Sequence, residues 1–413
     1  MANASRSKAW QIVALLFLAQ ILNFFDKNVL GLAAVHLMAE LNIDESAYGT
    51  LASSFYSLYA LSGVIVGLFF AHKIPSKWLL LFLVSIWTVA QLPMIFSSSF
   101  LMLVAGRVLL GVGEGPGSPA SMGATHEWFE DKDRALPTAI VVSGAFVGSL
   151  ISAPILSIAM EWFGWKAGFV VCFVLGICWL VLWALFGDTG PDSPARKAKQ
   201  ANEGPAERAN WTHPVILGCV TTAFCTYWVT GFTVAWLAPF VTMGLGFSPI
   251  DTGWILAGVW ANIAFWTLSM AGFSQYLTRR DVPTRMSRGW VIGCGMIGGA
   301  VCMAVMTLMD DTVMKMIFLG LGISLPQAAI TIGMATVSEV APSSQKGRMI
   351  ITIYSAITIA GLFAPYVAGK LINGAGLAGY HNAFLVNSVI LFVGGISAFL
   401  LLRPPEKRIH APS

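Results

Sequence analysis

The sequence predicts an all-α membrane protein with 12 transmembrane helices in two pseudo-symmetric six-helix bundles. Three observations predict it. Of the 413 residues, 56% are hydrophobic and only 11% are charged, a composition that excludes soluble globular classes. Apolar runs long enough to cross a bilayer, roughly 20 residues each, recur along the whole chain. Finally, weak sequence matches relate the two halves of the chain.

The apolar runs give the elements in order. The first begins at Trp10, is too long for the apolar core of a signal peptide and is followed by no small-residue cleavage site, so we expect a retained helix. Short polar segments with nearly all the charge separate the runs. The expected spans are 9–38, 47–71, 78–98, 100–126, 135–160, 166–187, 213–244, 250–276, 289–309, 313–340, 349–373 and 381–402.

The distribution of Lys and Arg predicts the orientation. With the N-terminus inside, 19 of the 24 Lys and Arg residues lie in cytoplasmic segments, while Lys166, Lys315 and Lys370 face out. Basic residues near helix ends are retained on the cytoplasmic side. We therefore expect a multi-pass protein of the cell (inner) membrane with both termini cytoplasmic. The net charge of +4 then reflects topology, and no nucleic-acid partner is expected.

A polar segment divides the chain into two halves. Residues 188–212 are rich in Pro, Gly, Ala and charge and lack apolar periodicity, so we expect a cytoplasmic linker between bundles at 1–187 and 213–413. Gly67 matches Gly272 and Pro154 matches Pro365, at offsets of 205 and 211. A parallel repeat of half the chain is typical of transporters whose substrate site lies at mid-membrane between two bundles.

The six cysteines all lie in apolar runs, without a CxxC pair or a histidine at ligand spacing. We expect buried, inert thiols and predict neither a metal site nor a cofactor.

Four ionisable residues remain inside apolar runs: Asp26, Lys27, Arg107 and Glu114. A charge at mid-bilayer costs several kcal/mol unless it is paired or hydrated, so such residues indicate function by default. Arg107 and Glu114, seven positions apart, share one helix face. The plain alternative is two structural ion pairs that hold helices together.

The functional interpretation gives each of the four a role. Desolvation and neighbouring cations shift the protonation of a buried carboxylate in opposite directions, so we expect Asp26 and Glu114 to exchange protons. Lys27 and Arg107 would attract an anion or pair with a carboxylate. The glycines and prolines around Glu114 allow close packing and bending. They do not form a phosphate-binding loop, because no strand precedes them and no Lys-Ser/Thr follows.

These residues resemble the major facilitator superfamily, specifically its anion:cation symporter family, which includes bacterial sugar-acid symporters and the sialic acid and vesicular glutamate transporters. The resemblance covers essentially the whole chain. Its most specific motif comprises Arg107, Glu114, Pro119, Trp128, Phe129 and Arg134; weaker matches are NFFDKN (23–28), SGAFVG (143–148), AWLAPF (235–240) and GLFAPYVAG (361–369).

The resemblance implies roles by position. Asp26 and Glu114 would be proton-coupling residues and Arg107 their partner, while Lys27 would meet the substrate carboxylate. Residues expected to line the substrate site are Tyr59, Ser143, Tyr354 and Thr358. Apart from the resemblance, the runs 213–244 and 250–276 are rich in tryptophan, most of which we expect at lipid-facing or interfacial positions. Trp228 and Trp236, both in the run 213–244, are the two expected to line the site.

Several positions depart from the family pattern. The family usually has Arg where this chain has Lys27. A lysine ammonium is a single point charge, whereas an arginine guanidinium can bind a carboxylate through two parallel hydrogen bonds. Ala145 replaces Gln and Thr358 replaces Asn of many sugar-acid members, which removes hydroxyl-binding groups. His72 and Gln275 occupy the Asp positions of the cytoplasmic loop motif.

The resulting prediction is import of a small organic carboxylate, weakly hydroxylated or aromatic, by proton symport through alternating access. The protein would act as a monomer and would not be an enzyme. The alternative is proton-coupled export, by antiport, of an apolar drug or metabolite. A receptor or scaffold would need an extramembrane domain, and the longest loop is the linker.

Overall fold

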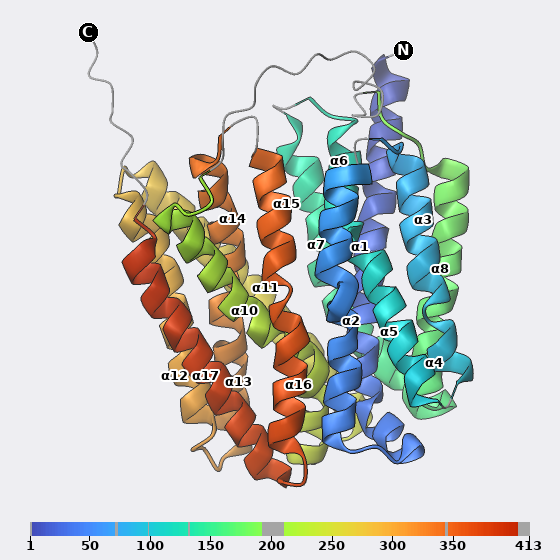
Figure 1. Ribbon diagram of the computed structural model, residues 1–413, viewed down its shortest axis with the longest axis vertical. Helices are drawn as coiled ribbons and strands as arrows, with labels where there is room; N and C mark the ends of the chain where they lie inside the picture. Colours follow the sequence, from blue (N-terminus) through green and yellow to red (C-terminus); the bar gives the residue numbers. More distant parts are fainter. Residues whose placement is uncertain are drawn as a thin grey trace. The chain divides into compact units, whose positions relative to one another are not determined.

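The computed structural model describes residues 2–70, 73–97, 99–130, 133–191, 210–342 and 346–403. All its regular elements in these ranges are helical (Figure 1). The all-α prediction is therefore confirmed. Most of the linker, and His72 of the loop motif, lie outside the described residues.

Eleven described helices are long and apolar enough to cross a membrane. The twelfth predicted span, 47–71, is formed by α2 (Glu45–Ile65) and the π-helical turn Val66–Phe70. Serines and tyrosines lie along α2, and this span is not among the eleven. Asp44 begins α2, because its side chain accepts a hydrogen bond from the backbone N–H of Ala47 at 2.7 Å.

The chain groups into two compact units. Unit 1 comprises residues 1–204, 231–261 and 354–380; unit 2 comprises residues 205–230, 262–353 and 381–413. The predicted division into bundles at 1–187 and 213–413 stays a prediction.

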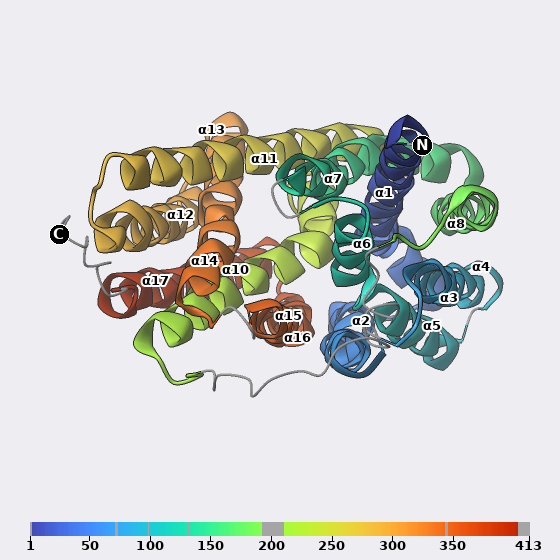
Figure 2. The same ribbon diagram turned by 90° about the horizontal axis from the view of Figure 1, so that it is seen from above.

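Unit 1 contains the N-terminal helices. They are α1 (Ala2–Leu41), α2, α3 (Ser76–Val89), α4 (Leu92–Phe96), α5 (Phe100–Glu114), α6 (Gly117–His126), α7 (Ala135–Phe163) and α8 (Lys166–Phe186). Helix α1 packs along α7, and α2 packs against α5. Helices α2, α5, α3 and α8 follow one another side by side (Figures 1 and 2).

Unit 1 also contains parts of later helices. It takes the second half of α10 (Pro214–Pro239) with the π-helical turn Phe240–Gly244, the first part of α11 (Pro249–Arg279), the end of α15 (Lys346–Ile357), α16 (Ala360–Ile372) and the start of α17 (Gly376–Leu401). Helix α16 packs on α2 where Gly49 and Gly369 meet: a Cβ on Gly49 would lie 2.7 Å from the carbonyl oxygen of Pro365. Small residues allow this close approach.

Unit 2 contains the remaining helical segments. They are the first half of α10, the rest of α11, the π-helical turn Arg285–Trp290, α12 (Val291–Met306), α13 (Thr312–Ser324), the 3₁₀ turn Leu325–Gln327, α14 (Ala328–Val340) and most of α15 and α17. Helix α12 packs against α13. Arg288 forms an ion pair with Glu339 of α14.

Four predicted spans are broken helices. The run 78–98 breaks at Ala90–Gln91, the run 100–126 at Gly115–Pro116, the run 313–340 at Leu325–Gln327 and the run 349–373 at Thr358–Ile359. Pro93, Pro116 and Pro326 stand at or beside three of these breaks. A proline removes an N–H donor and loosens the helix there.

The expected burial of the cysteines is wrong for two of them, because Cys178 and Cys294 are exposed on the surface of their helices. An apolar run that crosses a membrane has a lipid-facing side as well as a core side.

Candidate substrate site

The two adjacent charged residues of α1 point to different neighbours. Asp26 Oδ1 accepts a hydrogen bond from Gln91 Nε2 at 2.8 Å, at the break between α3 and α4. Lys27 Nζ donates to Asn23 Oδ1 at 2.6 Å and lies 3.7 Å from Glu114 Oε2. Successive side chains of a helix point about 100° apart, so one helix supplies both directions. Both residues are buried.

Glu114 is fully buried at the end of α5. Within the described part of the chain, neither of its carboxylate oxygens has a partner within hydrogen-bond geometry, and Lys27 forms an ion pair with it. Gly111, one turn earlier, lets α5 approach α2: a Cβ there would collide with the backbone carbonyl oxygen of Phe55. Close packing of α2 on α5 thus keeps water away from the carboxylate.

Arg107 is 3% exposed and its guanidinium carbon lies 5.1 Å from the centre of the Phe55 ring. This geometry is that of a cation–π contact. Its Nε and Nη1 atoms are buried and make no hydrogen bond to any described residue. Two donors of a buried cation are therefore unused, which is costly unless another group binds to them.

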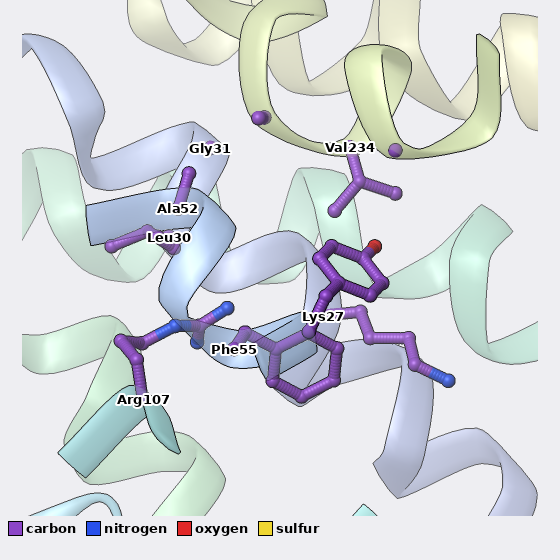
Figure 3. A pocket seen from close by; sticks show the side chains of 10 residues that line it. Lys27, Leu30, Gly31, Ala52, Phe55, Arg107 and Val234 are labelled. Carbon is purple, nitrogen blue, oxygen red and sulfur yellow. The ribbon is translucent and has the colours of Figure 1, made fainter. Parts of the chain in front are cut away.

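Lys27 and Arg107 line one cavity within unit 1, on either side of Phe55 in Figure 3. The space is about 10 Å³, close to the roughly 10–15 Å³ needed for one water molecule. Its other lining residues are small or apolar except for one tyrosine: Leu30, Gly31, Ala52, Phe55, Tyr56, Gly231, Val234 and Ala235. Two cations in an otherwise largely apolar enclosure suit a carboxylate, and the walls must separate to admit one.

Tyr59 and Ser143 lie in the helices expected from the sequence. Tyr59 is buried on α2, with Lys27 Nζ 5.5 Å from its ring centre. Ser143 is half-buried on α7 and donates to the carbonyl oxygen of Ile140. Tyr59 thus shares the surroundings of Lys27, whereas the Ser143 hydroxyl bonds to its own helix.

Tyr354 is half-buried on α15. Thr358 is fully buried at the break between α15 and α16, where its hydroxyl donates to the carbonyl oxygen of Ser355. The hydroxyl of Thr358 is therefore used to satisfy the backbone of the break.

The two candidate tryptophans fall in different units. Trp236 of unit 1 is fully buried, donates from Nε1 to the carbonyl oxygen of Pro365 at 3.0 Å and packs edge-on against Tyr48 at 5.0 Å. Its polar atom is thus committed to the packing of α10 on α16. Trp228 is half-buried and belongs to unit 2.

Sequence reasoning missed Gln91, the partner of Asp26. It also missed two polar contacts of α1, namely Ser118 Oγ to Gln20 Oε1 at 3.1 Å and Asn28 Nδ2 to Ser152 Oγ at 2.9 Å. Gln91 is the one amide of the run 78–98, whereas the run 9–38 has four, and an uncharged amide is a weaker signal of function than a charge.

Comparison with known proteins places the chain in a family. The family model described as Major Facilitator Superfamily matches residues 16–329 and 283–413. The chain belongs to the Major Facilitator Superfamily. This is a family of membrane transporters, as the resemblance predicted, and the fold is that of transporters and not of enzymes.

Several similar superfamily members are named for the substrates that they transport. A hexuronate transporter of Bacillus subtilis is 23% identical over 95% of this chain and 94% of its own length. A probable sulfoacetate transporter of Cupriavidus necator is 25% identical over 94% of this chain and 93% of its own. A probable galactarate/D-glucarate transporter of Bacillus subtilis is 24% identical over 99% of this chain and 94% of its own length.

Solved structures show the same superfamily fold. An inward-facing, unoccupied bacterial homologue of the human lysosomal transporter Spinster aligns with a TM-score of 0.80 and 17% identity, over 96% of this chain and 97% of that one. A D-xylose-proton symporter aligns with a TM-score of 0.75 and 15% identity, over 95% of this chain and 98% of that one. At these identities the likeness concerns the fold alone.

Proposed function

We propose that this protein imports a small organic carboxylate by proton symport through alternating access. The observation that supports it is the cavity that Lys27 and Arg107 line, where Lys27 also pairs with Glu114 and Arg107 has buried, unused donors. The similar hexuronate, sulfoacetate and galactarate/D-glucarate transporters all handle organic anions by name, which is the ligand class that two buried cations favour.

Coupling follows from competition for Lys27. When Glu114 is ionised, it pairs with the Lys27 ammonium at 3.7 Å. When Glu114 takes up a proton, Lys27 loses this counter-charge and binds a substrate carboxylate together with Arg107. Protonation of Glu114 therefore raises the affinity for the anion, and by thermodynamic linkage the bound anion raises the affinity of Glu114 for the proton. Asp26, which accepts a hydrogen bond from Gln91, is the second predicted proton site.

The uptake experiment uses purified protein in proteoliposomes, with D-glucuronate, D-glucarate and sulfoacetate as probes. An inward-directed proton gradient is expected to accelerate the uptake of at least one probe. Lys27→Gln is expected to weaken its apparent affinity about 10–100-fold, because it removes a charge-assisted hydrogen bond worth about 1.5–3 kcal/mol. Uptake that is indifferent to pH contradicts symport, and acceleration by an outward gradient indicates antiport instead.

We further propose a monomer in the cell (inner) membrane with both termini cytoplasmic. The excess of Lys and Arg in the segments assigned to that side supports it. A C-terminal green fluorescent protein should fluoresce in cells, whereas a C-terminal alkaline phosphatase should be inactive. The opposite pair of results contradicts this orientation.

A further inference from the structure

A second cavity, of about 390 Å³, lies within unit 2. Residues from the last turns of α11, from the π-helical turn Arg285–Trp290 and from α14 line it. Along α11 the lining extends from Ala271 to Arg279, which is about 12 Å at a rise of about 1.5 Å per residue. Small-molecule sites typically have about 300–1,000 Å³, so this cavity is large enough for a ligand of its own.

Two arginines line this cavity. Arg279 is the last residue of α11 and is exposed, whereas the side chain of Arg288 is 12% exposed. Gln275, Thr278 and Thr331 add an amide and two hydroxyls to the lining. No acidic residue is among the described residues that line the cavity. Two fixed positive charges together with neutral hydrogen-bonding groups favour an anionic ligand.

Arg288 has hydrogen-bond donors to spare. Its Nη2 atom forms an ion pair with Glu339, and its Nη1 atom lies 3.3 Å from Thr336 Oγ1, which is long for a hydrogen bond. Its Nε atom is buried and makes no hydrogen bond to any described residue. A guanidinium has five N–H donors, and a buried donor without a partner is costly. An anion that accepts hydrogen bonds from this guanidinium would offset that cost.

The segment beside the cavity is basic and lies at the ends of two membrane spans. Arg279 ends the span Pro249–Arg279, and Arg288 lies near the start of the next span. Residues 275–290 contain four arginines and one aspartate. Basic segments next to membrane helices attract anionic lipids, and basic pockets between such helices bind their headgroups. Charge and position therefore favour a lipid as the anion.

Exposed aromatic and apolar side chains border the same segment. Tyr276 and Trp290 are 52% and 45% exposed, and Phe273 and Met286, three and four positions before them, are also exposed. Tyr and Trp are enriched at the headgroup level of membranes, and apolar side chains exposed on a membrane span face lipid. A phospholipid can therefore use both the cations and the neighbouring apolar surface, whereas a free phosphate ion can use only the cations.

We propose that the cavity lined by Arg279 and Arg288 binds the headgroup of an anionic phospholipid. The phosphate oxygens accept hydrogen bonds from the two guanidinium groups, whose planar fork matches phosphate geometry. Gln275 and Thr278 offer donors and acceptors to the polar remainder of the headgroup. The inference goes beyond the proposed function, because it does not depend on which acid is transported.

The test measures lipid binding to the full-length purified protein in detergent. Native mass spectrometry counts bound dioleoylphosphatidylglycerol and dioleoylphosphatidylcholine, and thermal stabilisation reports their relative affinities. Wild-type protein is expected to prefer phosphatidylglycerol. Arg279→Gln is expected to weaken the binding of phosphatidylglycerol about fivefold and to change that of phosphatidylcholine less than about twofold. Arg288→Gln should weaken phosphatidylglycerol at least as much.

Arg280→Gln is the matched control. Arg280 follows Arg279 directly and is exposed, but it stacks on Tyr276 and is not among the residues that line the cavity. Its replacement removes the same charge and should change phosphatidylglycerol binding less than about twofold. Equal losses in Arg279→Gln and Arg280→Gln, or equal binding of the two lipids by wild type, would overturn the site.

Two soluble anions distinguish a lipid site from other anion sites. Inorganic phosphate and D-glucuronate are each added to wild-type protein and to Arg279→Gln, and thermal stabilisation is compared. Arg279→Gln should leave the effect of both anions unchanged. If it abolishes stabilisation by inorganic phosphate, the cavity binds a free anion and the lipid assignment is wrong. If it abolishes stabilisation by D-glucuronate, the cavity belongs to the substrate path and the inference is overturned.

Discussion

Replacing Arg107 by methionine is expected to stabilise the ligand-free protein. The guanidinium is 3% exposed, and its Nε and Nη1 atoms have no hydrogen-bond partner among the described residues. A buried polar group without a partner costs about 1–3 kcal/mol, and more when charged, whereas the contact with Phe55 returns about 0.5–2 kcal/mol. Methionine fills a similar volume without polar donors. We therefore expect a net gain on the order of 1 kcal/mol.

The assay is thermal unfolding in detergent, with and without D-glucuronate. At about 2–4 °C per kcal/mol for units of this size, the ligand-free midpoint of Arg107→Met should rise by roughly 2–4 °C, and the added stabilisation by D-glucuronate should disappear. Arg280→Met is the control, because Arg280 is exposed and stacks on Tyr276 at 5.1 Å. A ligand-free midpoint below that of wild type refutes the reasoning that Arg107 is held unpaired for a ligand.

Two further predictions concern packing and the role of an aromatic side chain. Gly111→Ala should destabilise the protein by about 1–3 kcal/mol, because the added Cβ collides with the Phe55 carbonyl oxygen. Gly123→Ala is the control and should not destabilise it, because the space around Gly123 is open. Equal unfolding midpoints for the two variants would contradict this packing. Trp236→Phe should lower the free energy of unfolding by about 1 kcal/mol, because it removes the hydrogen bond to the carbonyl oxygen of Pro365. The relative affinities for different acids should stay unchanged. Altered selectivity in a competition uptake assay would instead place Trp236 in the substrate site.

Hydropathy and charge were enough to predict the fold and to single out the charged residues of the candidate site. Each apolar run is a helix or a pair of helical segments, because backbone groups in lipid must be satisfied internally. Lys27, Arg107 and Glu114 stand out since a charge is expensive in such a run. Their proximity is confirmed for Lys27 and Glu114, which lie 3.7 Å apart.

Pairing between helices was not predictable from one sequence. Asp26 and Lys27 are neighbours in the chain, yet one meets Gln91 and the other Glu114, which depends on how α3, α4 and α5 pack. An uncharged amide such as Gln91 carries little hydropathy signal, so it was not singled out. Its importance depends on a helix break, and a proline predicts a possible bend without saying which side chains will meet there.

In the proposed mechanism, Glu114 releases and binds the coupled proton. The most direct measurement compares two uptake modes of Glu114→Gln in proteoliposomes: uptake driven by a proton gradient, and exchange of labelled for unlabelled substrate without a gradient. A glutamine mimics the protonated carboxyl but cannot release a proton. Exchange of labelled for unlabelled substrate should therefore persist in Glu114→Gln, while uptake driven by the proton gradient should be lost. Gradient-driven uptake at the wild-type rate in Glu114→Gln would contradict it.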